Sequence, residues 1–108
     1  MSVIQRLTSI TDNALAESGQ FEQAIEEFDK GNALAESGQL QQAVESYDKA
    51  LKIKHDLHEA WNNRSAVLLN LGSFKEALES FDKVLQIKPD FEQAIIVRTL
   101  LLGVLKKP

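Results

Sequence analysis

Apolar residues recur at intervals of three and four along almost the whole chain, which is the period of an amphipathic α-helix. Only two of the 108 residues are proline, so little interrupts this pattern. The sequence therefore predicts an all-α fold with about six helices, at residues 3–18, 21–37, 40–54, 58–71, 74–87 and 91–106.

The first predicted helix carries one apolar stripe, formed by Val3, Ile4, Leu7, Ile10, Ala14 and Leu15. Residues 18–20 follow it with the sequence SGQ, and glycine readily takes the left-handed conformation that ends helices. We therefore expect a turn at residues 18–20. Residues 1–20 are then an N-terminal packing helix, which lies in front of the helix that follows.

One repeat unit, His58 to Phe91, is the best-defined part of the chain. Much of the preceding segment repeats it, since Gly38 and Gly72, Ala43 and Ala77, and Tyr47 and Phe81 are each separated by one length of this unit. Within the unit, characteristic residues stand at the fourth, eighth, eleventh, fifteenth, twentieth, twenty-fourth, twenty-seventh and thirty-second places: Trp61, Ser65, Leu68, Gly72, Ala77, Phe81, Val84 and Pro89.

This spacing resembles the tetratricopeptide repeat, whose pattern places aromatic, small and large apolar residues, then Ala, an aromatic residue and Pro, at those places. The resemblance implies helix–turn–helix units stacked into a right-handed helical solenoid of antiparallel helix pairs. It also implies a protein that holds other proteins or peptides without catalysis. We divide the remaining chain into a repeat at residues 21–57, a complete repeat at 58–91 and a C-terminal capping helix at 92–108.

The octapeptide NALAESGQ occurs twice, at residues 13–20 and 32–39, so its two copies lie closer together than one full unit. The first copy therefore belongs to a shortened unit, which lacks the residues that would form the turn between two helices. We expect one continuous helix from Phe21 to Ser37, which serves as the first helix of its repeat. Gly31 costs this helix about 1 kcal/mol relative to Ala. We attribute its presence to close packing against the next helix.

The composition and the motifs argue against several classes of function. The net charge of −4 argues against a nucleic-acid partner, and the absence of Cys excludes disulfides and thiolate metal sites. The apolar run from Ala94 to Leu105 is too short to span a bilayer, so we expect no membrane partner. We also expect no signal peptide and a cytoplasmic protein. The sequence contains no phosphate-binding loop or nucleophile elbow, and His55 and His58 lack a closed zinc ligand set. We predict no enzyme activity, no cofactor and no metal.

The family resemblance places the ligand groove on the concave face, which the first helix of each unit lines. In the family, the lining places are the second, fifth, sixth, ninth, twelfth and thirteenth of each unit. From the residues at these places we predict the following partner-binding groove: Phe28, Asn32, Glu59, Asn62, Asn63, Ala66, Leu69, Asn70, Gln93, Ile96, Val97 and Leu100. Asp29, Ala35 and Glu36 stand at further lining places. Asn side chains donate hydrogen bonds to an extended peptide backbone and also accept them from it. The alternative is that these residues only form a polar, water-facing helix surface.

The segments KGNAL (30–34) and NNRSA (62–66) resemble the chaperone-binding branch of the family, which clamps a C-terminal carboxylate with two Asn residues and three cations. Asn32 and Asn63 keep the two amides, but the cationic places hold Phe28, Gln93 and Val97. A carboxylate needs charged donors to offset its desolvation, so we expect no such clamp.

Basic side chains recur at the seventh place of each unit, as Lys30, Arg64 and Arg98. They form a possible ladder for acidic ligands. We favour instead that their stems cover apolar surface at the packing seam.

The last predicted helix is apolar on nearly every side, with the sequence AIIVRTLLLGVL from residue 94 to 105. This predicts an alternative function, self-assembly as a homodimer through Ile95, Leu101, Leu102 and Leu105. A further reading is that the chain is a trimmed or engineered piece of a longer repeat array. The identity of the partner does not follow from the sequence.

Overall fold

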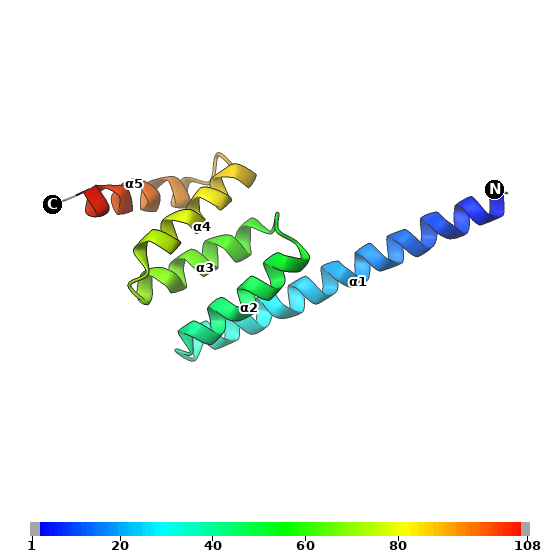
Figure 1. Cartoon of the computed structure of the whole chain (residues 1–108), viewed down its shortest axis with the longest axis horizontal. Coiled ribbons are helices and arrows are strands. Elements are labelled where there is room, and N and C mark those ends of the chain that lie inside the picture. The colour runs from blue at the N-terminus through cyan, green and yellow to red at the C-terminus, as the bar shows by residue number, and fades with distance from the viewer. Residues whose placement is uncertain (1–2, 107–108) are drawn as a thin grey trace.

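A computed structural model describes the backbone of residues 3–106 and the side chains of Val3 and residues 17–106. Five helices follow one another in this part of the chain: α1 (Val3–Glu36), α2 (Leu40–Ile53), α3 (His58–Asn70), α4 (Phe74–Ile87) and α5 (Glu92–Lys106). Successive helices pack side by side as a short solenoid, which confirms the predicted all-α fold (Figure 1). None of these helices combines the length and apolar character needed to cross a bilayer.

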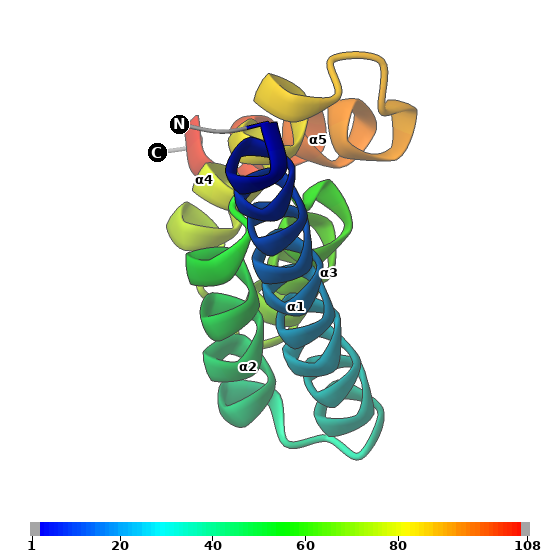
Figure 2. The same cartoon turned by 90° about the vertical axis from the view of Figure 1, so that its right-hand side faces the viewer.

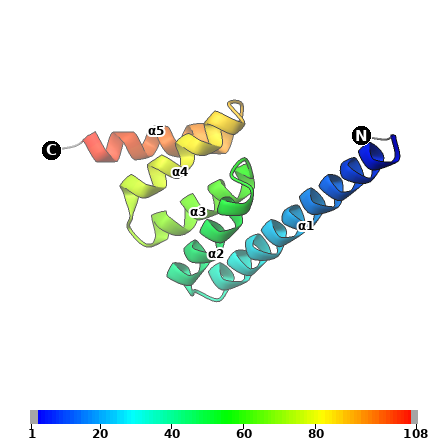
Figure 3. The ribbon, with the colours of Figure 1, turned by 45° about the vertical axis from the view of Figure 1, so that its right-hand side comes forward.

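The prediction of a turn at residues 18–20 was wrong. Residues 18–20 are helical, so the helices predicted at 3–18 and 21–37 are a single helix of 34 residues. This is why the structure has five helices rather than about six. The continuous helix through Gly31 is confirmed, because α1 ends only at Glu36. The N-terminal half of α1 extends away from the other helices instead of packing in front of them (Figure 3).

The end of the solenoid formed by α1 is polar, which explains why nothing needs to pack in front of it. The third, seventh and tenth places of a first helix face the preceding unit. In α1 these places hold Glu26, Lys30 and Ala33, which are all exposed. The same places in α3 and α5 hold Ala60, Arg64 and Val67, and Ala94, Arg98 and Leu101, of which the four apolar residues are buried. We name Glu26, Lys30 and Ala33 the polar end face.

Gly38 and Gly72 end α1 and α3 in the same way. Both have positive φ, 81° and 78°, which glycine adopts without a steric cost. Beyond α1, the backbone N–H groups of Gly38 and Gln39 donate to the carbonyls of Ala35 and Leu34, at 3.1 and 2.9 Å. This Schellman arrangement reverses the chain, so that α2 returns alongside α1 (Figure 2).

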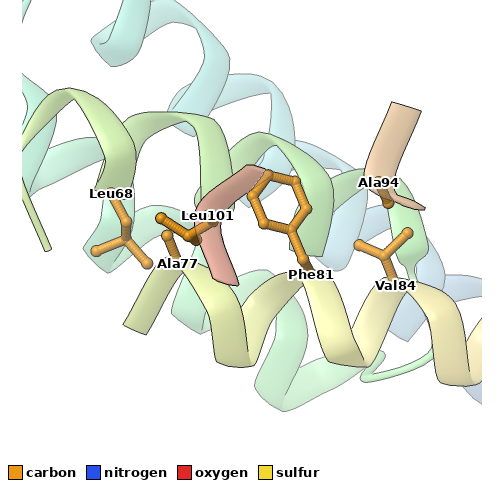
Figure 4. Close-up of a cluster of buried hydrophobic side chains, with 6 residues drawn as sticks. All are labelled: Leu68, Ala77, Phe81, Val84, Ala94 and Leu101. Carbon is orange, nitrogen blue, oxygen red and sulfur yellow. The ribbon is translucent and has the colours of Figure 1, made fainter. Parts of the chain in front are cut away.

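The buried side chains form two clusters. The larger joins α3, α4 and α5 and contains Leu68, Ala77, Phe81, Val84, Ala94 and Leu101 (Figure 4). The smaller joins α2 and α3 through Ala43, Tyr47 and Val67, with Phe28 of α1 packed against it. Gly31 lies against the Tyr47 ring, because a Cβ atom added there would stand 2.6 Å from Cε1. The predicted close packing at Gly31 is therefore present.

Candidate functional site

A concave feature that carries polar groups from three helices lies between α1, α2 and α3. This central hollow has a volume of about 480 Å³ and is lined by Asn32, Ala35 and Glu36 of α1, Leu40 and Tyr47 of α2, and Asn63, Ala66, Val67 and Asn70 of α3. Helical periodicity puts these residues there. Asn32 and Glu36 are four residues apart, and Asn63, Ala66 and Asn70 are separated by three and four.

An amide network fixes the floor of the central hollow. The side-chain oxygen of Asn32 accepts hydrogen bonds from the Tyr47 hydroxyl at 2.5 Å and from Nδ2 of Asn63 at 2.9 Å. Burial raises the pKa of Tyr47, and the nearby Glu36 carboxylate raises it further, against the opposing effect of the Asn63 amide. Tyr47 is therefore a neutral donor at physiological pH, and it holds the two amides in one orientation.

The network leaves amide groups of both asparagines available to a ligand. It uses the oxygen of Asn32 and the nitrogen of Asn63, so Nδ2 of Asn32 and Oδ1 of Asn63 keep their hydrogen-bonding capacity. Asn70 adds a third amide to the same hollow. An extended peptide presents alternating backbone N–H and C=O groups, which such amides can pair with.

The predicted groove residues separate into two groups. Asn32, Asn63, Ala66 and Asn70 line the central hollow, together with Ala35 and Glu36. The others do not line it. Phe28 packs against the Tyr47 ring, with centroids 6.0 Å apart, while Leu69 and Val97 pack against the larger core cluster. Of the remaining five, Asn62 is half-buried on α3 and four are exposed: Glu59, Gln93, Ile96 and Leu100.

Sequence reasoning missed Leu40, Tyr47 and Val67 as lining residues. A signal for Tyr47 existed in the comparison of the two repeats. The equivalent of Tyr47 in the next repeat is Phe81, and the equivalent of Asn32 is Ala66. The hydroxyl and its amide acceptor thus appear together in one repeat and are absent together from the next.

The ladder of basic residues is largely neutralised within the chain. Nε of Arg64 donates to Oδ1 of Asp48 at 2.7 Å, and Arg64 also donates to the buried Ser80 hydroxyl. Arg98 pairs in the same way with Asp82, which is the equivalent of Asp48 in the next repeat. Each arginine thus ties the first helix of one unit to the second helix of the preceding unit. Lys30 belongs to the polar end face and is exposed.

We expect Arg64→Met to lower the free energy of unfolding by about 1–3 kcal/mol, since it removes charge-assisted hydrogen bonds and leaves the Ser80 hydroxyl without this partner. Lys30→Met at the equivalent exposed place is the matched control, and should change stability by no more than about 0.5 kcal/mol. Urea denaturation followed by circular dichroism measures both. Equal effects of the two substitutions would contradict the structural role of the Arg64 bonds.

The apolar residues of α5 lie on three faces. Leu101 is only 6% exposed and packs in the larger core cluster, so its assignment to a self-association surface was wrong. Leu102 and Leu105 are half-buried, and Ile95 is 42% exposed. A different set is more open, the apolar stripe of α5, which consists of Ile96, Leu100 and Val104 at 59%, 65% and 57% exposure.

The His58 side chain has a packing role in the structure, whereas His55 contributes its backbone. The backbone carbonyl of His55 accepts a hydrogen bond from the Trp61 indole at 2.8 Å, and the His58 ring meets the Phe91 ring edge-on. In the described residues no group of three or more His, Asp or Glu side chains comes together to hold a metal ion. The absence of a cofactor stays a prediction.

Two family models match the chain. A model described as "TPR repeat" matches residues 31–72, and one described as "Tetratricopeptide repeat" matches residues 58–95, so together they cover more than half of the 108 residues. The chain belongs to the tetratricopeptide repeat family. Tetratricopeptide repeats stack into solenoids whose concave faces hold other proteins, and they are in general not catalytic.

Solved tetratricopeptide repeat domains share the fold. The second such domain of Spaghetti (RPAP3), bound to the HSP90 peptide SRMEEVD, is 22% identical with a TM-score of 0.77, over 83% of this chain and 82% of that one. The Arabidopsis OM64 domain is 27% identical with a TM-score of 0.75, over 80% and 71%. The TPR2B domain of yeast Sti1 in complex with pHsp70 is 26% identical with a TM-score of 0.72, over 79% and 68%. No curated protein matches the chain significantly.

Proposed function

We propose that this tetratricopeptide repeat chain binds an extended segment of a partner protein in the central hollow, without catalysing a reaction. The observation that carries the proposal is the amide network, in which Tyr47 orients Asn32 and Asn63 and leaves a donor and an acceptor available. The peptides bound by the similar domains of RPAP3 and Sti1 support this use of the fold.

The proposal predicts that peptides can be selected against the chain and that their binding depends on the hollow. A phage-displayed library of random dodecapeptides is the probe, and fluorescence anisotropy of the selected peptides measures their affinity. Ala66→Arg places a long side chain in the hollow and should weaken binding by about tenfold or more. Gln42→Arg adds the same charge at an exposed place of α2 outside the hollow and should have little effect.

The proposal fails if no selected peptide is sensitive to Ala66→Arg. It also fails if Gln42→Arg weakens binding to the same extent, because the added charge and not the hollow would then be responsible.

A second candidate function is self-association through α5. On the predicted contact face of α5, Ile95 is exposed and Leu102 and Leu105 are only half-buried, whereas α1 presents a polar end face. Burying a Leu or Ile side chain contributes about 1.5–3 kcal/mol, so leaving several in water favours association. A twofold dimer would cover the helix of each copy with the other.

Size-exclusion chromatography with light scattering tests this second candidate. We expect twice the mass of one chain at high micromolar concentration, and one chain mass for Leu102→Glu combined with Ile95→Lys. The pair Ile96→Lys and Leu100→Glu, on the apolar stripe of α5, should leave the dimer intact. If only the Ile96 and Leu100 pair gives a monomer, the contact lies on the apolar stripe of α5 instead. A monomeric unmodified chain would disprove self-association.

A further inference from the structure

The ionisable residues at the lining places of the first helices are all acidic. They are Asp29 and Glu36 on α1 and Glu59 on α3, and all three are exposed. Asp29 lies one turn before Asn32, and Glu59 lies one turn before Asn63, so both share a helix face with the amide network. Glu36 lines the central hollow itself. The site is the hollow with its amides, and these carboxylates determine which ligand charge it favours.

The basic residues of the first helices do not stand at these lining places, and Lys30 belongs to the polar end face. The guanidinium groups of Arg64 and Arg98 are bound to the carboxylates of Asp48 and Asp82, which belong to the second helices α2 and α4. They therefore stabilise contacts between neighbouring units, and the lining places keep three negative charges. A ligand carboxylate would meet repulsion here, whereas a Lys or Arg side chain would find carboxylate partners.

The other half of the concave face is apolar. Ile96, Leu100 and Val104 are the equivalents, one repeat later, of Asn62, Ala66 and Asn70, and so occupy the same face of the next first helix. Their side chains are more than half exposed. The face thus changes from amides and carboxylates on α1 and α3 to aliphatic side chains on α5.

We propose that the partner segment of this chain is basic at one end and aliphatic at the other. One or two Lys or Arg side chains lie beside Glu36 and Glu59, the backbone pairs with the amides, and aliphatic side chains cover the apolar stripe of α5. This inference rests on the proposed function, because it describes the ligand of the same concave face. It assigns the opposite ligand charge to that of the acidic peptide SRMEEVD bound by the RPAP3 domain.

Synthetic peptides test the inference directly. The basic probes are fluorescein-labelled KKGSGSLVL and its reverse LVLSGSGKK, since either chain direction is possible, and the acidic probes are EEGSGSLVL and SRMEEVD. In fluorescence anisotropy at low salt, the better basic probe should bind about tenfold more tightly than either acidic probe. Added sodium chloride should reduce that difference, because it screens exposed charges.

Charge reversal in the face supplies the matched comparison. Glu36→Lys combined with Glu59→Lys should invert the preference in favour of EEGSGSLVL. Glu26→Lys combined with Glu79→Lys produces the same change in net charge at exposed places that do not line the hollow, and should leave the preference for the basic probe in place. Leu100→Ser combined with Val104→Ser should reduce the affinity for the basic probe to about that of a peptide that lacks the LVL end.

Equal binding of basic and acidic probes by the unmodified chain would overturn the inference. So would inversion by the Glu26 and Glu79 pair, because net charge alone would then explain the preference. The ligand assignment and the proposed function fail separately. If the selected peptides are weakened by Ala66→Arg but carry no basic residue, the inference is refuted and the proposed function stands. If Ala66→Arg does not change the affinity of the selected peptides, the proposed function itself is refuted.

Discussion

Gly31→Ala is expected to lower the free energy of unfolding by about 1–3 kcal/mol. Helix propensity alone predicts the opposite, since Ala is favoured over Gly by about 1 kcal/mol inside a helix. The difference arises because a Cβ atom at residue 31 would stand 2.6 and 2.7 Å from two ring carbons of Tyr47. The Tyr47 ring is almost fully buried and its hydroxyl is held by Asn32, so it cannot move aside freely.

Gly103→Ala in α5 is the matched control, because nothing lies within 4 Å of the added Cβ atom. It should stabilise the chain slightly, by up to about 1 kcal/mol. The midpoint and slope of urea denaturation give both values. In a Tyr47→Ala background, Gly31→Ala should no longer be destabilising. Stabilisation by Gly31→Ala in the unmodified chain would show that α1 and α2 do not approach this closely in solution.

The repeat register predicted most of the solenoid correctly because it reports contacts that recur. Leu68, Ala77, Phe81 and Val84 occupy repeat places whose partners are present in the chain, and they form the larger core cluster. Gly31 and Ser65 occupy the eighth place of their units, and both are buried. These residues could be assigned from spacing alone, since each has an equivalent one repeat away or a partner in the adjoining helix.

Prediction was weaker in α5, which is apolar on nearly every side. Its apolar character led us to assign Leu101 to self-association, whereas the register pairs Leu101 with buried Val67 of α3, and Leu101 packs against α4 in the larger core cluster. For the site, spacing located Asn32, Asn63 and Asn70 on one concave face. It did not reveal that Tyr47 crosses from α2 to orient two of them, because that contact occurs in only one repeat.

The two copies of NALAESGQ show that local sequence does not decide the turn. At residues 32–39 the octapeptide ends α1 and turns at Gly38, whereas at residues 13–20 it is helical throughout. A turn at Gly19 would return the chain onto the face that carries Ala24, Phe28 and Gly31. That face is already occupied, since Ala24 is fully buried and both Phe28 and Gly31 contact Tyr47 of α2. A second turn would gain no packing, so the helix continues and keeps its backbone hydrogen bonds.

This explanation predicts opposite effects of one substitution in two identical octapeptides. Gly38→Ala should cost about 1–2 kcal/mol in urea denaturation, because φ at residue 38 is +81° and an L-residue is disfavoured there. Gly19→Ala should instead slow amide exchange in residues 13–20, since Ala strengthens a helix by up to about 1 kcal/mol. Packing is not involved at either place, because an added Cβ atom meets nothing within 4 Å. Faster exchange after Gly19→Ala, or a loss of stability like that of Gly38→Ala, would mean that residues 18–20 form a left-handed turn in solution and that residues 3–18 fold back as a separate helix.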